Sequence, residues 1–221
     1  MTRAVGIDIS KYDLTYSPKV NTDFVIQRLS YGLMKDERLE ALQPAVLSVP
    51  VRGAYHYASS NVPWKAQVDL FLSLAAGKYD FLALDFEKDY NVDSSSFIGG
   101  VASALSTIQL ASRKPVVLYV NPDTWNTWLL PVHSDLLQFD IWLAQYFTNR
   151  RDTDPLVPVT MTRGWKFWQW NDVGDGATYG TGGKHVDLDD FNGTVDDLHL
   201  WAHATVYKVC PMCNGTGKIP A

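Results

Sequence analysis

Eight short apolar segments, each bounded by polar residues, glycine or proline, limit the possible folds of this chain more than any other feature. They are VGIDI (5–9), FVIQRLSY (24–31), VRGAYHYA (51–58), YDFLALDFE (79–87), PVVLYV (115–120), DIWLAQY (140–146), WKFWQW (165–170) and HVDLDDF (185–191). Several are continuous rather than alternating, as is typical of strands covered on both faces. The pattern therefore predicts a sheet of eight strands buried among other elements.

Helical patterns separate several of these segments. Val68, Phe71, Leu72 and Ala75 follow the spacing of one helix face. A second helix is expected after the serines at 94–96 and a third over 38–47. Strands that alternate with helices favour a parallel sheet, and eight of them suggest a closed barrel. Two later connections are rich in Gly, Pro and Thr. The predicted fold is thus an α/β, irregular TIM-like (β/α) barrel of eight strands with an incomplete outer helical ring.

The length of 221 residues suits one barrel domain, which we place at 1–204, followed by a short cysteine-containing tail at 205–221. The net charge is −5 and the longest basic cluster is Arg150-Arg151, so we expect no nucleic-acid partner. No segment approaches the roughly 18 apolar residues of a membrane span, so we expect no membrane insertion. The start, MTRAVGIDIS, leaves no room for a signal peptide, which predicts synthesis in the cytosol.

The segment LALDFEKD places two carboxylates at the carboxyl end of the fourth predicted strand. Side chains alternate on a strand, so Asp85 and Glu87 share a face, about 6.6 Å apart along the chain, and Phe86 points the other way. Catalytic groups of parallel barrels gather at that end. One of two close carboxylates tends to stay protonated, so the pair suits general acid catalysis on a glycosidic bond. The alternative is that Asp85 caps a loop and Glu87 pairs with Lys88 or an arginine.

Two further aspartates lie in the first and last predicted strands, Asp8 in GIDIS and Asp187 in HVDLDDF. First and eighth strands are neighbours in a closed barrel, so these carboxylates are expected to meet; the alternative for each is a turn or cap residue. Aromatic residues near strand ends either stack on sugar rings or fill the core. They are Tyr55, Tyr57, Tyr119, Trp142, Tyr146, Trp168 and Trp170.

The order of eight short sequences resembles that of family 25 glycoside hydrolases, the Chalaropsis-type lysozymes. The sequences are GIDIS, FVIQRLSYG, GAYHYA, LALDFE, PVVLYVN, IWLAQY, FWQW and VDLDDFNG, and they extend over residues 4–194. The resemblance implies an irregular barrel and a muramidase that cleaves the β-1,4 bond from N-acetylmuramic acid to N-acetylglucosamine in peptidoglycan glycan strands. It implies that Glu87 is the general acid, Asp85 its partner, and Asp8 and Asp187 further aspartates of the groove. No cofactor is implied for catalysis.

The resemblance also suggests substrate-binding residues, with two departures. The positions are Tyr57, Tyr119, Trp142, Tyr146 and Gln169, among which the three tyrosines match best. The family usually has an acidic T-E-G-type sequence where this chain has Tyr31 and Gly32. It often has Asn at the position of Asp189, a carboxylate that we expect to shift the pKa of Asp187.

The mechanism implied by the pair retains the anomeric configuration. Glu87 protonates the leaving oxygen, and Asp85 either attacks the sugar or orients the 2-acetamido group of the substrate for attack. Muramidase chemistry without a signal peptide suggests a phage endolysin. Such a protein is made in the host cytoplasm and acts on the cell wall once the membrane is permeabilised.

The tail sequence CPMCNGTGK resembles half of a zinc-binding unit of DnaJ-type chaperones. Cys210 and Cys213 could complete a structural zinc site with His199 and His203, because such sites need four ligands. The alternatives are a second chain that supplies the other pair, which would make a dimer through the cysteines, or a flexible tail with free thiols or a disulfide.

Two other functional classes are consistent with a barrel. A catalytically inactive glycan-binding module would not need the pair formed by Asp85 and Glu87. A metal-dependent barrel hydrolase typically has H-x-H on its first strand, and the first strand here is GIDIS.

Overall fold

The computed structural model describes residues 2–87, 95–146 and 153–204. The strands are β1 (Val5–Ile9), β2 (Phe24–Tyr31), β3 (Met34–Lys35), β4 (Val51–Tyr57), β5 (Phe81–Asp85), β6 (Val116–Val120), β7 (Asp140–Ala144), β8 (Phe167–Asp175) and β9 (His185–Phe191). The helices are α1 (Leu39–Val46), α2 (Trp64–Ala75), α3 (Ser95–Ser112), α4 (Pro122–Thr127), the 3-10 turn η1 (Leu130–Val132), α5 (His133–Leu136), α6 (Gly176–Tyr179) and α7 (Val195–Ala202).

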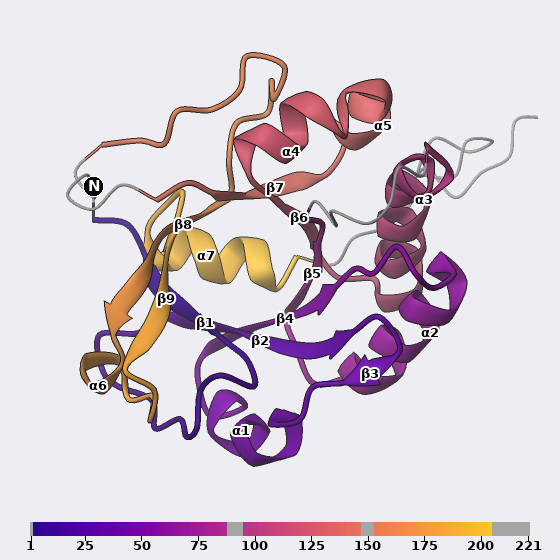
Figure 1. The fold of residues 1–221 in the computed structure, drawn as a ribbon. Coiled ribbons are helices and arrows are strands. Elements are labelled where there is room, and N and C mark those ends of the chain that lie inside the picture. The colour runs from indigo at the N-terminus through magenta and orange to yellow at the C-terminus, as the bar shows by residue number, and fades with distance from the viewer. Residues whose placement is uncertain (1, 88–94, 147–152, 205–221) are drawn as a thin grey trace, which may run out of the picture.

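The strands form a closed barrel (Figure 1). The sheet order is β1-β9-β8-β7-β6-β5-β4-β2-β3, and β1 also pairs with β2, which closes a ring of eight strands. The short β3 lies outside the ring as a hairpin partner of β2. The prediction of an eight-stranded irregular α/β barrel is confirmed.

The direction of the last strand differs from the prediction of a parallel sheet. β9 runs antiparallel to both of its neighbours, β1 and β8. A parallel connection needs a crossover of a dozen or more residues. The chain between β8 and β9 holds only the four-residue α6 and a turn, so the two strands form a long hairpin with two register shifts.

The helices cover part of the outer surface of the barrel. α1, α2 and α3 form where the sequence predicts them, and their buried residues pack on the outer face of the sheet. Gly77 follows α2 with a φ of +71°, the left-handed conformation that glycine adopts readily. In the described part of the connection from β7 to β8 (153–166) there is no helix. No described helix is both long enough and apolar enough to span a membrane.

Aromatic rings close the barrel at the ends where the parallel strands begin. The rings are those of Phe24, Phe81, Phe167 and Phe191, and all four are buried. α7 lies across this end (Figure 1), and the Trp201 ring contacts Phe81 and Phe167 with centroid distances of 5.1 and 5.2 Å. The base is therefore solid, and polar inward-facing residues concentrate at the opposite end.

Candidate active site

Asp85 and Glu87 lie together at the carboxyl end of β5. The Asp85 carbonyl accepts a 2.9 Å hydrogen bond from the Ala58 amide, and the Phe86 amide donates to the Tyr119 carbonyl at 3.1 Å. Phe86 is buried on the outer face against Phe97, with ring centroids 5.6 Å apart. The backbone is thus fixed by both neighbouring strands, and the predicted alternation across this segment is confirmed.

Two tyrosine hydroxyls donate to the half-buried Glu87, those of Tyr57 from β4 and Tyr119 from β6. Burial raises the pKa of Glu87 and the two hydroxyls partly offset this rise, because they stabilise the charged form. The net shift is upward, toward the range in which a carboxylic acid can give up a proton near neutral pH.

Asp85 is buried beside Glu87. Its pKa is raised by burial and by the charges of Glu87 and Asp8, while the Arg28 guanidinium lowers it. Its Oδ1 atom has no hydrogen-bond partner in the described part of the chain. A buried acceptor of this kind is energetically unfavourable unless a water molecule or another polar group satisfies it.

Gln169 on β8 joins the tyrosines to the first strand. Its Oε1 atom accepts from the hydroxyls of Tyr119 (2.8 Å) and Tyr146 (2.7 Å), and its Nε2 donates to Asp8 Oδ2 at 2.6 Å. The Tyr119 hydroxyl therefore faces two acceptors, Glu87 and Gln169, with a single proton to donate. A continuous hydrogen-bond network runs from Glu87 across the barrel to Asp8.

Asp8 and Asp187 are directly opposite each other in the register of β1 and β9, which confirms that these strands bring them together. Burial raises the pKa of Asp187 to about 9, and the charges of Asp8, Asp13, Asp172 and Glu87 add to this effect. The raised pKa means that Asp187 keeps its proton to higher pH than a free carboxyl does, and the protonated form can donate a hydrogen bond.

Asp189 forms a buried acid pair with Asp8. The two carboxyl groups hydrogen-bond to each other, which requires a proton on one of them, and burial raises both pKa values. The Trp142 indole donates to Asp189 Oδ1 at 2.8 Å. We expected Asp189 to shift the pKa of Asp187; the structure instead pairs it with Asp8, and the charge of Asp187 raises the pKa of Asp189.

The predicted aromatic residues separate into two groups. Tyr146 is 48% exposed and Tyr57 is partly exposed, so both can contact a ligand. The others are buried or packed against the core, namely Tyr55, Tyr119, Trp142, Trp168 and Trp170. Trp142 presents no ring face at the surface, because it packs edge-on against Tyr119 and Tyr55. The Trp142 indole instead hydrogen-bonds to Asp189. Gln169 is also buried and hydrogen-bonds to protein side chains, those of Tyr119, Tyr146 and Asp8.

Arg28 is the residue at the site that the sequence analysis missed. It donates from Nε to Asp36 Oδ2 at 2.6 Å, and its charge lowers the pKa values of Asp85 and Asp13. The alternation of side chains along β2 could have identified it, because Phe24 and Ile26 face the interior and Arg28 lies two residues further on the same face. A cation at that position lies beside the carboxylates.

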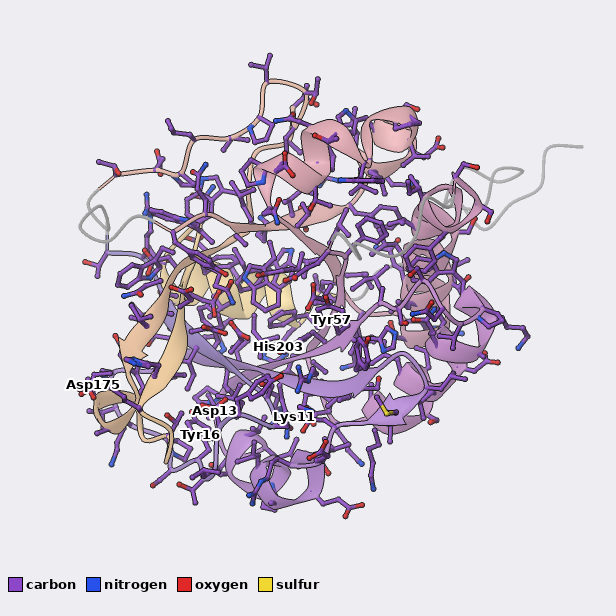
Figure 2. The ribbon with its side chains drawn as sticks, viewed as in Figure 1. Lys11, Asp13, Tyr16, Tyr57, Asp175 and His203 are labelled. Atoms are coloured by element: carbon purple, nitrogen blue, oxygen red, sulfur yellow. The ribbon has the colours of Figure 1, made fainter. Side chains whose placement is uncertain are left out.

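The described residues show no metal centre. Among them, no group of three or more His, Cys, Asp and Glu side chains could hold a metal ion. His199 and His203 have ring centroids 5.9 Å apart, while Cys210 and Cys213 lie outside the described residues. His203, labelled in Figure 2, follows α7 and lies 3.8 Å from Asp80, at the base of the barrel. The predicted zinc site has no support in this structure.

Comparisons with known proteins identify the family of the chain and its shared fold. Residues 7–178 match the family described as Glycosyl hydrolases family 25. An Escherichia coli K12 protein named YegX, described as uncharacterized, is 31% identical over 153 residues, which is 68% of this chain and 52% of YegX. The chain thus spans about half the length of the curated relatives it matches.

Two solved structures show the same fold. The bacterial lysozyme from Streptomyces coelicolor superposes with a TM-score of 0.80 at 24% identity, covering 93% of this chain and 100% of the lysozyme. The catalytic domain of endolysin ply40 from bacteriophage P40 of Listeria monocytogenes gives 0.73 at 22% identity, covering 92% and 98%. The match over residues 7–178 includes Asp8, Asp85 and Glu87. The chain therefore belongs to family 25 of the glycoside hydrolases.

Proposed function

We propose that the chain is a muramidase that hydrolyses the β-1,4 bond from N-acetylmuramic acid to N-acetylglucosamine in peptidoglycan. The observation that carries the proposal is the placement of Glu87 and Asp85 on one face at the open end of the barrel, with Glu87 held by two tyrosine hydroxyls. A solved relative of the same fold is a lysozyme and another is a muramidase from Acremonium alcalophilum.

In the first step Glu87 gives its proton to the glycosidic oxygen, and the bond from this oxygen to the anomeric carbon breaks. A new bond forms to that carbon on the opposite face. Its oxygen comes either from the Asp85 carboxylate or from the acetamido carbonyl of the substrate, with Asp85 accepting from the acetamido N–H. Asp85 ends β5 beside Glu87, so its carboxylate is the group proposed for either role.

In the second step a water molecule attacks the anomeric carbon from the face that the leaving group vacated. The Glu87 carboxylate takes the proton of this water, and the bond formed in the first step breaks. Two displacements on the same carbon retain the configuration. Tyr119 supports both states of Glu87, because its hydroxyl can donate to the carboxylate or turn toward Gln169 when Glu87 is protonated.

The test is a digestion of purified peptidoglycan, followed by borohydride reduction and mass spectrometry of the new terminal sugar. We expect reduced muramic acid from the wild type and a loss of at least about 10²-fold in rate from Glu87→Gln. Asp69→Asn, which changes an exposed carboxylate on α2 that pairs with Lys65, is the control and keeps full activity. Reduced glucosamine would move the cut to the other bond. Wall binding without new reducing ends would favour an inactive glycan-binding module.

We also propose a role as a phage endolysin that reaches the wall after the membrane is permeabilised. Its support is the structural similarity to the catalytic domain of an endolysin from a Listeria phage. Expression in bacterial cytoplasm should leave the culture turbid until the membrane is permeabilised, and should then cause lysis that depends on Glu87. Lysis without permeabilisation would contradict this role. Residues 1–204 would form the catalytic unit and 205–221 a separate tail.

A further inference from the structure

We propose that a pocket beside the active site is a subsite for an uncharged sugar unit of the glycan strand, remote from the cleaved bond. We call it the hairpin pocket, because its residues come from the β2–β3 hairpin and the segments beside it. Its lining includes Lys11, Tyr12, Tyr31, Met34, Lys35 and Tyr57, and its volume is about 400 Å³. This volume falls within the range of roughly 300–1,000 Å³ that is typical of ligand sites. The proposal rests on the proposed function.

The hairpin pocket is continuous with the active site through Tyr57, which Figure 2 labels. The Tyr57 hydroxyl donates to Glu87, while its ring packs against the Tyr31 ring with centroids 5.1 Å apart. A strand bound with its scissile bond at Glu87 can therefore extend over Tyr57 and place a further unit against Tyr31.

Exposed rings and a thioether form one side of the hairpin pocket. Tyr12 is 74% exposed, Tyr31 38% and Met34 61%, and all three line the same pocket. The apolar face of a pyranose ring can pack on these groups, which would remove them from water. This exposure lies in the segment where the sequence departs from the family pattern, at Tyr31 and Gly32.

The charges of the hairpin pocket favour a neutral unit over an acidic stem peptide. Lys11 Nζ lies 3.2 Å from Glu37, Lys35 Nζ lies 2.7 Å from Glu40, and Arg28 is paired with the buried Asp36. Each cation of the lining thus already has a carboxylate partner. These groups can hydrogen-bond to hydroxyl and acetamido groups, but they leave little uncompensated positive charge for a carboxylate ligand.

Asp36 fixes the floor of the hairpin pocket. Besides Arg28, its carboxylate accepts from the amides of Lys11 (3.1 Å) and Arg38 (2.8 Å), and its own amide donates to the Leu29 carbonyl at 2.8 Å. These contacts join the chain after β1 to the β2–β3 hairpin. The pocket is consequently formed before any ligand binds, which lowers the entropy cost of binding.

The test compares Tyr31→Ala and Met34→Ala with Leu33→Ala. Leu33 is 51% exposed in the same hairpin but does not line the pocket, so it is a matched control. Substrates are peptide-free glycan strands, fractionated by length, and peptide-bearing strands of the same length. We expect kcat/KM of both pocket variants to fall about tenfold or more on long strands and to change less than twofold on the shortest strand that is cleaved. Leu33→Ala should match the wild type on every length.

Three results would overturn the subsite: no loss in the pocket variants, an equal loss on all lengths, or a loss confined to peptide-bearing strands. The last would assign the pocket to the peptide. Failure of the proposed function is separate, because it would appear as a wild type that cleaves no strand. In that case the subsite is tested by calorimetry, which measures the binding of long peptide-free strands to Glu87→Gln and to the double variant Glu87→Gln/Tyr31→Ala. If the subsite exists, the double variant binds about tenfold more weakly.

Discussion

Gln169 on β8 donates a hydrogen bond of 2.6 Å to Asp8 on β1, 161 residues earlier in the chain. Both residues are buried, and β9 lies between their strands in the sheet. Because the same Gln169 amide accepts from Tyr119, and Tyr119 also contacts Glu87, the protonation of the candidate acid is connected to residues on three strands, β6, β8 and β1.

Tyr119→Phe should move the alkaline limb of the activity profile to higher pH. The Tyr119 hydroxyl stabilises the charged form of Glu87 and lowers its pKa, so its removal raises that pKa further. Activity requires protonated Glu87 and is lost as the pH rises through this pKa. We expect the alkaline limb of the kcat/KM profile to lie at a measurably higher pH than in the wild type. Tyr16→Phe is the control, because the Tyr16 hydroxyl is buried without a hydrogen-bond partner among the described residues. A limb that stays in place would separate Tyr119 from Glu87.

Asp187→Asn should flatten the dependence of stability on pH. The pKa of Asp187 is raised from 3.8 to about 9 in the folded chain, so between these values the native state holds a proton that the unfolded state has lost. The free energy of unfolding therefore decreases as the pH rises across this window, by up to about 1.4 kcal/mol per unit from this group. Asparagine removes that contribution.

Urea unfolding of Asp187→Asn at pH 5, 6, 7 and 8 measures this slope. Asp69→Asn changes an exposed carboxylate on α2 and should leave the slope unchanged. The same slope in Asp187→Asn and in the wild type would show that Asp187 is charged at neutral pH, contrary to the prediction.

Asp189→Asn should stabilise the chain at pH 8. The asparagine Oδ1 can still accept from the Trp142 indole, and its amide can donate to Asp8, which removes the need for a shared proton. We expect a gain of about 1–3 kcal/mol, larger at pH 8 than at pH 5, because a carboxyl with a raised pKa destabilises most where its proton is hardest to retain. Asp190→Asn is the contrasting variant and should destabilise, because Asp190 lies 3.6 Å from Arg3. A loss of stability in Asp189→Asn would contradict the shared proton between Asp8 and Asp189.

The sequence predicted the parts of the site that depend on one strand or on neighbouring strands. Alternation alone placed Asp85 and Glu87 on one face, and barrel closure brought Asp8 beside Asp187. The sequence pattern could not predict that Gln169 bridges Tyr119 and Asp8, because that contact depends on the tilt and stagger of strands far apart in the sequence. Arg28 was missed for a different reason. A single inward-facing cation carries no motif and shows its role only beside Asp85.

Gly53→Ala should destabilise the barrel, since the base has no room for a methyl group on β4. A Cβ at Gly53 would lie 2.3 Å from the Phe81 ring, which is itself fixed against Phe167 and Trp201. We expect a loss of about 1–3 kcal/mol in the free energy of unfolding, measured by urea denaturation.

Gly99→Ala is the matched control for this change. It adds the same methyl group within α3, where a Cβ would meet nothing within 4 Å. Alanine is preferred to glycine inside a helix, so this variant should gain roughly 0.5–1 kcal/mol. If both substitutions stabilise, the Phe81 ring can move aside and the base is looser than its aromatic packing indicates. If only Gly53→Ala destabilises, the close approach of β4 to the Phe81 ring is what requires glycine at that position.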